Sequence, residues 1–393
     1  MSVTAPKGFV AAGAPAGIKP TGQPDMAIVA TADRRPVTAA AVFTTNKAAA
    51  APVVVSRSNL RATAGNAVAV VLNSGNANAA TGHQGKDTAE RTCTAAAKEL
   101  GCDPTEVLVC STGLIGIPLD GALLERAMPG LATAASSAGG GDAAAAIMTT
   151  DTHAKQVIVD SHEGFVVGGM AKGAAMLAPN MATMLAVLTT DAGADHPSLH
   201  HALANAVAGS FNRLTVDGCT STNDTVIVLA NGSSGHTTAT DHLAAALTEA
   251  CVALAEQMAG DAEGATKVVR VTVTGATDDA QAAAAARNIA ESQLTKCSWY
   301  GCDPYWGRVA SDAGSAPGVD FDMDRLSVGY GDITVARNGV AVDLTPDERA
   351  RLHEHMAGRH LEVAVDLGLG DGAWWLLTND LTHAYVDENM GTS

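Results

Sequence analysis

The stretch KGAAMLAPNMATMLAVLTT, residues 172–190, contains the strongest local indication of the fold. Its first half reads as a turn, because a glycine follows Lys172 and Pro179-Asn180 comes a few residues later. Its second half, MLAVL at residues 184–188, is a short continuous apolar run. A run of this kind, bounded by turn residues, predicts a strand buried on both faces. Thr183 is therefore expected where a loop enters a core strand.

Outside this stretch, predicted strands alternate with predicted helices. Short apolar runs between Met26 and Val55, and the run NAVAVVL at residues 66–72, also predict buried strands. Longer segments carry apolar residues at a spacing of three or four, which is typical of helices packed on a sheet. These segments are residues 87–100, 118–137, 196–211 and 240–258. The alternation predicts an α/β fold built in layers.

Two glycine-rich segments are predicted to be loops. The triplet GGG at residues 139–141 is expected in a surface loop, with a connector between subdomains as the alternative. The segment GLGDG at residues 368–372 lies between predicted strands at 361–366 and 373–377. Because a strand follows it, we interpret it as a hairpin turn and not as a dinucleotide-binding loop. Nearby, TPDE at residues 345–348 has the cap, proline and glutamate that open a helix.

The composition indicates a globular chain with an acidic surface. The chain has 393 residues, of which 47% are hydrophobic, and this is enough for a substantial core. Its 41 acidic and 24 basic residues give a net charge of −17, which repels nucleic acids and anionic lipids alike. Neither is expected as a partner. The N-terminus has no signal-peptide pattern and no long uninterrupted apolar segment follows, so we predict a cytoplasmic protein.

The sequence contains no metal or cofactor motif. Its seven cysteines are scattered, without a C-x-x-C pair. His353, His355 and His360 lack the H-E-x-x-H spacing, and we interpret them as part of a solvated helix face. The phosphate loop and the G-x-S-x-G elbow are also absent. We therefore predict a protein that uses neither a metal nor a bound cofactor.

Thr183 could supply both a nucleophile and a base if it became a chain start. A hydroxyl is a weak nucleophile at its normal pKa and needs an adjacent base. An N-terminal α-amine, with an unperturbed pKa of about 7.7–8.0, is partly neutral near pH 7 and lies within reach of its own Oγ. Spacing alone does not identify such a residue, because threonines often begin strands.

Residues 172–190 resemble the cleavage segment of the glutamate N-acetyltransferase family of arginine biosynthesis, also called ornithine acetyltransferases. Other blocks resemble that family in the same order, so the resemblance spans nearly the whole chain. These blocks are PKGF at 6–9, NSGNAN at 73–78, TTDT at 149–152, STNDT at 221–225 and DPYWGR at 303–308. The chain departs from the family pattern at Ala80, Ala175, Cys302 and Tyr305, and its C-terminus, Asn389 to Ser393, is one residue short and lacks the tyrosine that is usual there.

The resemblance implies roles for individual residues. Thr112 and Gly113, in the block CSTGLIG, would form the oxyanion hole, and Thr183 would be the nucleophile released by cleavage of the Ala182–Thr183 bond. Lys172 would hold an α-carboxylate and Glu263 a cationic group. The implied substrate contacts are Thr150, Lys172, Thr183, Glu263, Asn389 and Ser393.

The resemblance also implies a fold and a reaction. The fold would be a layered αββα sandwich with a smaller C-terminal α/β domain. Self-cleavage would give an α chain, residues 1–182, and a β chain, residues 183–393, associated as α2β2 or a larger assembly. The enzyme would move the acetyl group of N2-acetyl-L-ornithine to L-glutamate by a ping-pong route through acetyl-Thr183.

Four alternatives remain open on the sequence. The enzyme could be bifunctional and also use acetyl-CoA, or it could be a paralogue that serves a specialised pathway with another acylated amino acid. It could instead be an N-terminal-nucleophile amidase that passes its acyl group to water. The last alternative is an uncleaved binding protein that has kept the fold without activity.

Overall fold

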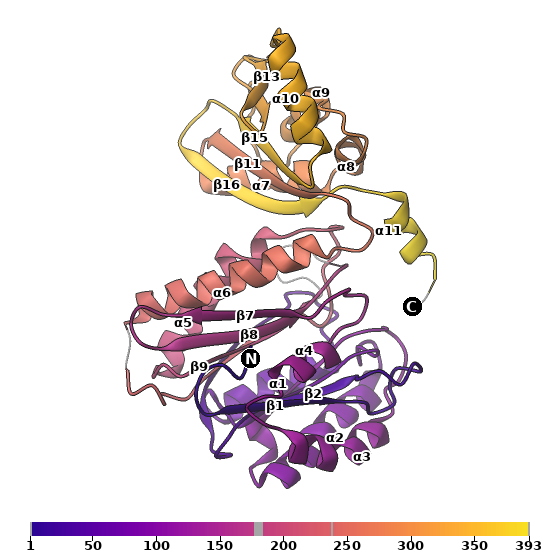
Figure 1. Ribbon diagram of the computed structural model, residues 1–393, viewed down its shortest axis with the longest axis vertical. Helices are drawn as coiled ribbons and strands as arrows, with labels where there is room; N and C mark the ends of the chain where they lie inside the picture. The colour runs from indigo at the N-terminus through magenta and orange to yellow at the C-terminus, as the bar shows by residue number, and fades with distance from the viewer. Residues whose placement is uncertain (1, 177–183, 237–238, 392–393) are drawn as a thin grey trace. The chain divides into compact units, whose positions relative to one another are not determined.

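The computed structural model describes residues 2–176, 184–236 and 239–391 (Figure 1). The chain folds into two compact units, one made of Met1–Asn212 and Cys219–Met258, the other of Arg213–Gly218 and Ala259–Ser393. Both units combine sheets with helices, so the predicted α/β class is confirmed. In the described parts of the chain, no helix has both the length and the apolar character that crossing a membrane requires.

The first unit contains two sheets. The smaller has the strand order β1-β2-β5-β6 and the larger has the order β4-β3-β10-β9-β8-β7. The strands of the smaller sheet are β1 (Phe9–Ala14), β2 (Met26–Thr31), β5 (Ala69–Asn73) and β6 (Val107–Ser111). Those of the larger are β3 (Val37–Phe43), β4 (Asn66–Ala67), β7 (Lys155–Asp160), β8 (Val166–Lys172), β9 (Leu185–Thr190) and β10 (Thr225–Ala230). All six residues of β9 are buried, as the apolar run predicted.

Helices cover the outer faces of these two sheets. They are α1 (Ala51–Ala62), α2 (Gly82–Leu100), α3 (Gly121–Ala134), α5 (His196–Gly209) and α6 (Thr240–Gly260). The short helix α4 (Gly140–Ala146) instead packs between the two sheets, in contact with β1, β2, β7 and β8 (Figure 1). Along β2, Ala27 and Val29 belong to the core that also contains Ile227 of the larger sheet, whereas Met26 and Ile28 belong to a second core shared with α2 and α3. Because successive side chains of a strand point to opposite faces, these cores lie on the two sides of the smaller sheet. On the far side of the larger sheet, α5 packs on β3 and β10, which completes the predicted αββα sandwich (Figure 1).

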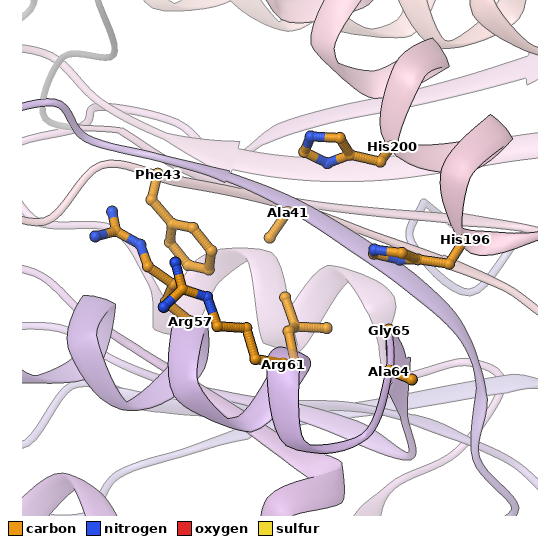
Figure 2. Close-up of a pocket in the computed structure, with 9 residues that line it drawn as sticks. Ala41, Phe43, Arg57, Arg61, Ala64, Gly65, His196 and His200 are labelled. Atoms are coloured by element: carbon orange, nitrogen blue, oxygen red, sulfur yellow. The ribbon is translucent and has the colours of Figure 1, made fainter.

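Helix α1 and helix α5 are both close to β3, near the edge of the larger sheet. A hollow is lined by residues of these three elements and by the turn that follows α1 (Figure 2). It lies entirely within the first unit.

Three local predictions for the first unit are wrong. Residues 51–55 were expected in a strand but begin α1, with Pro52 in its first turn, where proline is favoured. The run 66–72 is divided between β4 and β5, which belong to different sheets. The glycines at 139–141 are the start of α4 and not a surface loop. A Cβ at Gly139 would lie 1.8 Å from the carbonyl oxygen of Ala11, so only glycine fits at this position.

The second unit is built on one sheet with the order β14-β13-β12-β15-β11-β16. Its strands are β11 (Val268–Ala276), β12 (Ser327–Tyr330), β13 (Ile333–Arg337), β14 (Val340–Ala341), β15 (His360–Asp366) and β16 (Gly372–Asn379). Its helices are α7 (Asp279–Glu291), α8 (Gln293–Tyr300), α9 (Trp306–Gly314), α10 (Pro346–Ala357) and α11 (His383–Glu388). In β15, Leu361, Val363 and Val365 are buried while the residues between them are exposed, so this strand presents one apolar face to the core.

The glycine-rich segment at 368–372 is not a hairpin turn, which corrects that prediction. Strands β15 and β16 are not paired with each other, because β11 lies between them. The connection therefore crosses the end of β11, and the amide nitrogen of Gly368 comes within 2.6 Å of the position that a Cβ would take at Gly275. The helix predicted from TPDE is confirmed, since Thr345 and Glu348 form a capping box at the start of α10.

Candidate functional site

The larger sheet of the first unit aligns four strand ends in one row. Lys172, the last residue of β8, is paired with Leu185, the first residue of β9. Leu185 is paired with Thr225 at the start of β10, and Thr225 with Phe43 at the end of β3. Ala182 and Thr183, the predicted cleavage and nucleophile residues, lie outside the described residues, as does Ser393. The row nevertheless fixes the backbone that continues from Thr183.

Asp224 holds the first described residue after Thr183. Its Oδ1 accepts a hydrogen bond of 2.9 Å from the backbone N–H of Met184. The side chain is fully buried, and among the described residues its Oδ2 has no hydrogen-bond partner. Burial raises the pKa of this carboxyl well above its usual range, against the opposite effect of the Met184 hydrogen bond. Burial therefore disfavours the charged form of Asp224.

Asn223, the neighbour of Asp224, ties the larger sheet to the smaller one. Its Nδ2 donates to the carbonyl oxygen of Ala77 at 2.6 Å and to that of Ser111 at 2.8 Å. Ser111 is the last residue of β6 and directly precedes Thr112. Two consecutive residues thus fix the backbone on both sides: Asn223 holds the segment that leads to Thr112, and Asp224 holds Met184.

Thr112 and Gly113 have the properties that an oxyanion site requires. Among the described residues, the buried Oγ1 of Thr112 has no hydrogen-bond partner. Gly113 is exposed, and its amide donates to no group in the described part of the chain. Its φ is +128°, and a Cβ there would lie 2.3 Å from the carbonyl carbon of Gly75. Only glycine satisfies both conditions, so the turn presents an open N–H.

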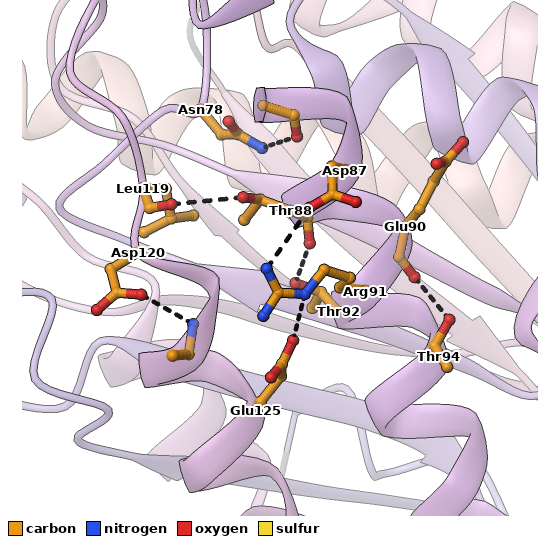
Figure 3. A network of polar contacts seen from close by, with 12 residues as sticks. Asn78, Asp87, Thr88, Glu90, Arg91, Thr92, Thr94, Leu119, Asp120 and Glu125 are labelled. Atoms are coloured by element: carbon orange, nitrogen blue, oxygen red, sulfur yellow. Dashed lines mark hydrogen bonds and ion pairs between the residues drawn. The ribbon is translucent and has the colours of Figure 1, made fainter. Parts of the chain in front are cut away.

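The neighbouring loop, NSGNAN at 73–78, is held rigidly by its asparagines. The Oγ of Ser111 donates to Asn73 Oδ1 at 2.6 Å, and Asn73 Nδ2 donates to the Asn76 carbonyl at 2.8 Å. Asn78 Nδ2 donates to the carbonyl of Gly85 in α2 at 2.8 Å (Figure 3). Farther along α2, Arg91 is paired with Glu125 of α3, so the two helices that support the loop are also joined (Figure 3).

Lys172 belongs to a buried cluster of charged groups. Asp151 Oδ1 accepts hydrogen bonds from Lys155 Nζ at 2.7 Å and from the Gly173 amide at 2.8 Å, while its Oδ2 lies 3.9 Å from Lys172 Nζ. Lys155 is fully buried and Lys172 is 3% exposed. Burial alone would raise the pKa of Asp151, but the two lysines and the hydrogen bonds outweigh it and lower that pKa. The cluster thus places two lysine side chains beside the Asp151 carboxylate.

Thr150 precedes Asp151 and is exposed at the edge of this cluster. Its neighbour Thr149 donates its amide to Asp151 Oδ2 at 3.0 Å, so the backbone of the TTDT block is anchored on the same carboxylate. Thr150 thus directly precedes the carboxylate that lies 3.9 Å from Lys172 Nζ.

Glu263 and Asn389, both in the second unit, are in direct contact. Asn389 Nδ2 donates to Glu263 Oε2 at 2.8 Å. Glu263 also lines a pocket of about 110 Å³ in that unit. Its charged lining residues are Asp217, Glu263, Glu291, Lys296 and Asp380, four acids and one base. Such a pocket attracts a cation.

The single lysine of this pocket is itself buried. Lys296 Nζ donates to the Val216 carbonyl at 2.5 Å and to Thr378 Oγ1 at 3.1 Å. Burial lowers the pKa of Lys296 to about 8, although Asp217, Asp380 and Glu291 act in the opposite direction. Above that pH the pocket becomes more negative.

The sequence analysis gave no role to Asp151, Lys155, Asn223, Asp224 or Lys296. Two of them, Asn223 and Asp224, lie in the STNDT block directly before a fully buried strand. A run of polar residues that ends at such a strand is a signal that could have identified them, because polar groups at that position are buried and need partners.

Comparisons with known proteins give one consistent match. The profile of the ArgJ family matches residues 10–391. The arginine biosynthesis bifunctional protein ArgJ of Mycolicibacterium paratuberculosis is 47% identical over 401 residues, covering 100% of this chain and 96% of that protein. The protein of the same name from Streptomyces coelicolor is 46% identical over 398 residues and is covered in full.

Two solved structures are also similar. One is ornithine acetyltransferase from Mycobacterium tuberculosis in complex with ornithine, 44% identical, with a TM-score of 0.43 over 45% of this chain and 94% of that chain. The other is the ArgJ protein of Bacillus halodurans, 33% identical, with a TM-score of 0.47 over 51% of this chain and 95% of that chain.

Proposed function

The chain belongs to the ArgJ family, and from this premise we propose that it transfers the acetyl group of N2-acetyl-L-ornithine to L-glutamate through an acetyl ester on Thr183. The observation that carries the proposal is the row of strand ends, in which Lys172 is paired with Leu185 and Asp224 holds the Met184 amide. This row surrounds the chain position at which the nucleophile would begin.

We propose that the chain first cleaves itself between Ala182 and Thr183, giving residues 1–182 and 183–393. Strand β9 of the second product would then lie between β8 of the first product and β10 of its own chain. Six paired residues on each side, all of β9 being buried, would keep the products together without a covalent link. Assembly into α2β2 or a larger oligomer, in the cytoplasm, is part of this proposal.

In the first half-reaction, Thr183 Oγ would attack the acetyl carbonyl of acetylornithine while its own α-amine takes the hydroxyl proton. The tetrahedral oxyanion would be held by the Gly113 amide and the Thr112 hydroxyl, both of which lack described partners. As the carbon–nitrogen bond breaks, the α-amine would return the proton to ornithine. Glutamate would then attack the acetyl-threonine and leave as N-acetylglutamate.

The charged clusters support binding of amino-acid substrates. We propose that the ammonium group of Lys172 attracts the α-carboxylate, with Thr150 as a further contact. Glu263, in its acidic pocket, would attract the cationic side chain of ornithine, and Asn389 would hold the Glu263 carboxylate in place. Ser393 is proposed as an additional contact on the resemblance alone.

A denaturing gel combined with an exchange assay tests the proposal. Purified wild-type protein should give two bands whose sequenced N-termini are the original start and Thr183. The Thr183→Ala variant should remain one full-length chain and should transfer no acetyl group. Incubation of the wild type with acetylornithine should add one acetyl group to the larger fragment, detected by mass spectrometry.

The proposal would be contradicted by a full-length wild-type chain that is fully active, or by cleavage at another bond. Hydrolysis of acetylornithine that is as fast without glutamate as with it would instead identify an amidase. Release of free CoA from acetyl-CoA would show that the enzyme is bifunctional and also uses acetyl-CoA.

A further inference from the structure

The hollow beside α1 and α5 in the first unit has a strongly basic lining. It has a volume of about 520 Å³, and its charged or titratable lining residues are Arg57, Arg61, His196 and His200. None of the described residues that line it carries a carboxylate. In Figure 2 the two arginines come from α1 and the two histidines from α5, on opposite sides of the hollow. A basic hollow is unexpected in a chain with a net charge of −17.

The ring of His196 is fixed in this lining. Its Nδ1 is 2.8 Å from the carbonyl oxygen of Ala39, so Nδ1 carries the hydrogen and Nε2 is available to a ligand. A Cβ at residue 65 would lie 2.1 Å from the same Nδ1, and Gly65 has a φ of +82°. Both facts require a glycine beside the ring. His200 is stacked one turn further on, with ring centroids 6.0 Å apart.

The arginines are available for an external anion. The guanidinium of Arg57 lies 5.3 Å from the ring centre of Phe43, and this stacking fixes its plane. Within residues 2–176, 184–236 and 239–391, no carboxylate forms an ion pair with Arg57 or Arg61. Other exposed arginines of the chain, such as Arg91 and Arg351, do have acidic partners.

We propose that this hollow binds the phosphate group of a small molecule. Two guanidinium groups match the geometry of phosphate oxygens, and the exposed His200 ring can add one N–H donor on the opposite side. The apolar lining residues Phe43, Leu60 and Ala41 leave room for an organic part. The hollow is not part of the proposed acetyl-transfer machinery, although Phe43 lies at the end of the same row of strand ends.

Isothermal titration of the whole purified protein with inorganic pyrophosphate and with ADP tests this site. The wild type should bind at least one of them saturably at low salt. The double variant Arg57→Gln/Arg61→Gln should bind about tenfold more weakly or worse, since it loses two charge-assisted contacts. The variant Arg34→Gln/Arg35→Gln is the matched control, because it removes the same charge from an exposed turn of the same unit.

The two ligands also separate the possible sources of phosphate. Tighter binding of ADP identifies a phosphate ester as the ligand class, and equal or tighter binding of pyrophosphate identifies free phosphate. Because Arg57 also packs on Phe43, the exposed His200→Asn variant serves as a second test and should weaken binding while the melting temperature is unchanged. Absence of saturable wild-type binding, or equal losses in the double variant and its control, overturns the proposal.

Discussion

Asp151 and Asp224 are two buried carboxyl groups in the same unit, yet their pKa values are shifted in opposite directions. Asp151 lies beside Lys155 and Lys172, and its pKa is lowered. Asp224 has no ion-pair partner in contact among the described residues, and burial raises its pKa. Burial is nearly the same for both, so the neighbours decide the direction of the pKa shift. The first carboxyl lies between two lysines, and the second accepts a hydrogen bond from a backbone amide.

The largest effect is expected from removing the charge of Asp151. Asp151→Asn takes away the carboxylate that lies 2.7 Å from the fully buried Lys155. We expect a loss of about 3–5 kcal/mol in the free energy of unfolding, measured by urea denaturation. The double variant Asp151→Asn/Lys155→Met should recover part of this loss, because it removes the buried positive charge as well. Unchanged stability of Asp151→Asn would show that this ion pair is not what ionises the cluster.

A smaller effect, on self-cleavage, is expected from Asp224. Asp224→Ala removes the acceptor of the Met184 amide and should slow appearance of the two fragments about tenfold, on a gel of freshly synthesised chain. Asp224→Asn keeps a neutral carbonyl acceptor and should cleave at a rate close to that of the wild type.

Asp191 offers a control at the other end of β9. It is also buried, and it accepts backbone hydrogen bonds from Val166 at 2.8 Å and from Lys7 at 3.3 Å. Asp191→Ala should lower the melting temperature but leave cleavage unchanged. If Asp224→Asn were as slow as Asp224→Ala, the reaction would need a carboxylate, and the contrast with Asp151 would fail.

The pH dependence of stability should separate the two acids. A lowered pKa gives Asp151 a stabilising contribution that is present above the unfolded pKa of about 3.9 and is lost as the pH falls through the folded value. A raised pKa gives Asp224 a contribution that is complete below the unfolded value and is lost as the pH rises through the folded one. The free energy of unfolding, measured by urea denaturation across pH, should therefore fall less steeply toward acid pH in Asp151→Asn. In Asp224→Asn it should fall less steeply toward alkaline pH.

The smallest effect concerns Lys296, which extends the comparison to a base in the second unit. Its pKa of about 8 is below the unfolded value of about 10.4. The unfolded chain then binds more protons between these values, so stability should rise with pH across this window. Lys296→Met should remove that rise, as measured by urea denaturation from pH 7 to 10. If the slope of stability against pH were unaltered in Lys296→Met, the rise would belong to another group.

Sequence patterns identified the elements whose signals are local. The run at 184–188 predicted β9, and the capping residues at 345–348 predicted α10, because each pattern lies within the element that it specifies. Predictions failed where contacts with distant parts of the chain determine the local structure. Gly139, at the start of α4, lies against the carbonyl oxygen of Ala11, and the segment at 368–372 crosses a strand that is almost a hundred residues earlier.

The same distinction applies to the candidate site. Family membership and the enzyme class were predicted from resemblance and are confirmed by the match over residues 10–391. The individual roles of Thr112, Gly113, Thr150, Glu263 and Asn389 stay predictions. The contact between Asp224 and Met184 joins residues 40 positions apart, so no local pattern indicates it. A pairing of this kind becomes visible only when the strand register is known.

Strand β9 has a neighbour on each side, β8 before position 183 and β10 after it. If the two halves were encoded by separate genes, the second would have to insert its first strand into a sheet that the first half cannot finish alone. An intramolecular association would become a bimolecular one, and the effective concentration that a covalent tether provides would be lost. If the chain is cut as proposed, this sheet requires one order of events: translation as one polypeptide, closure of the sheet, and then the cut.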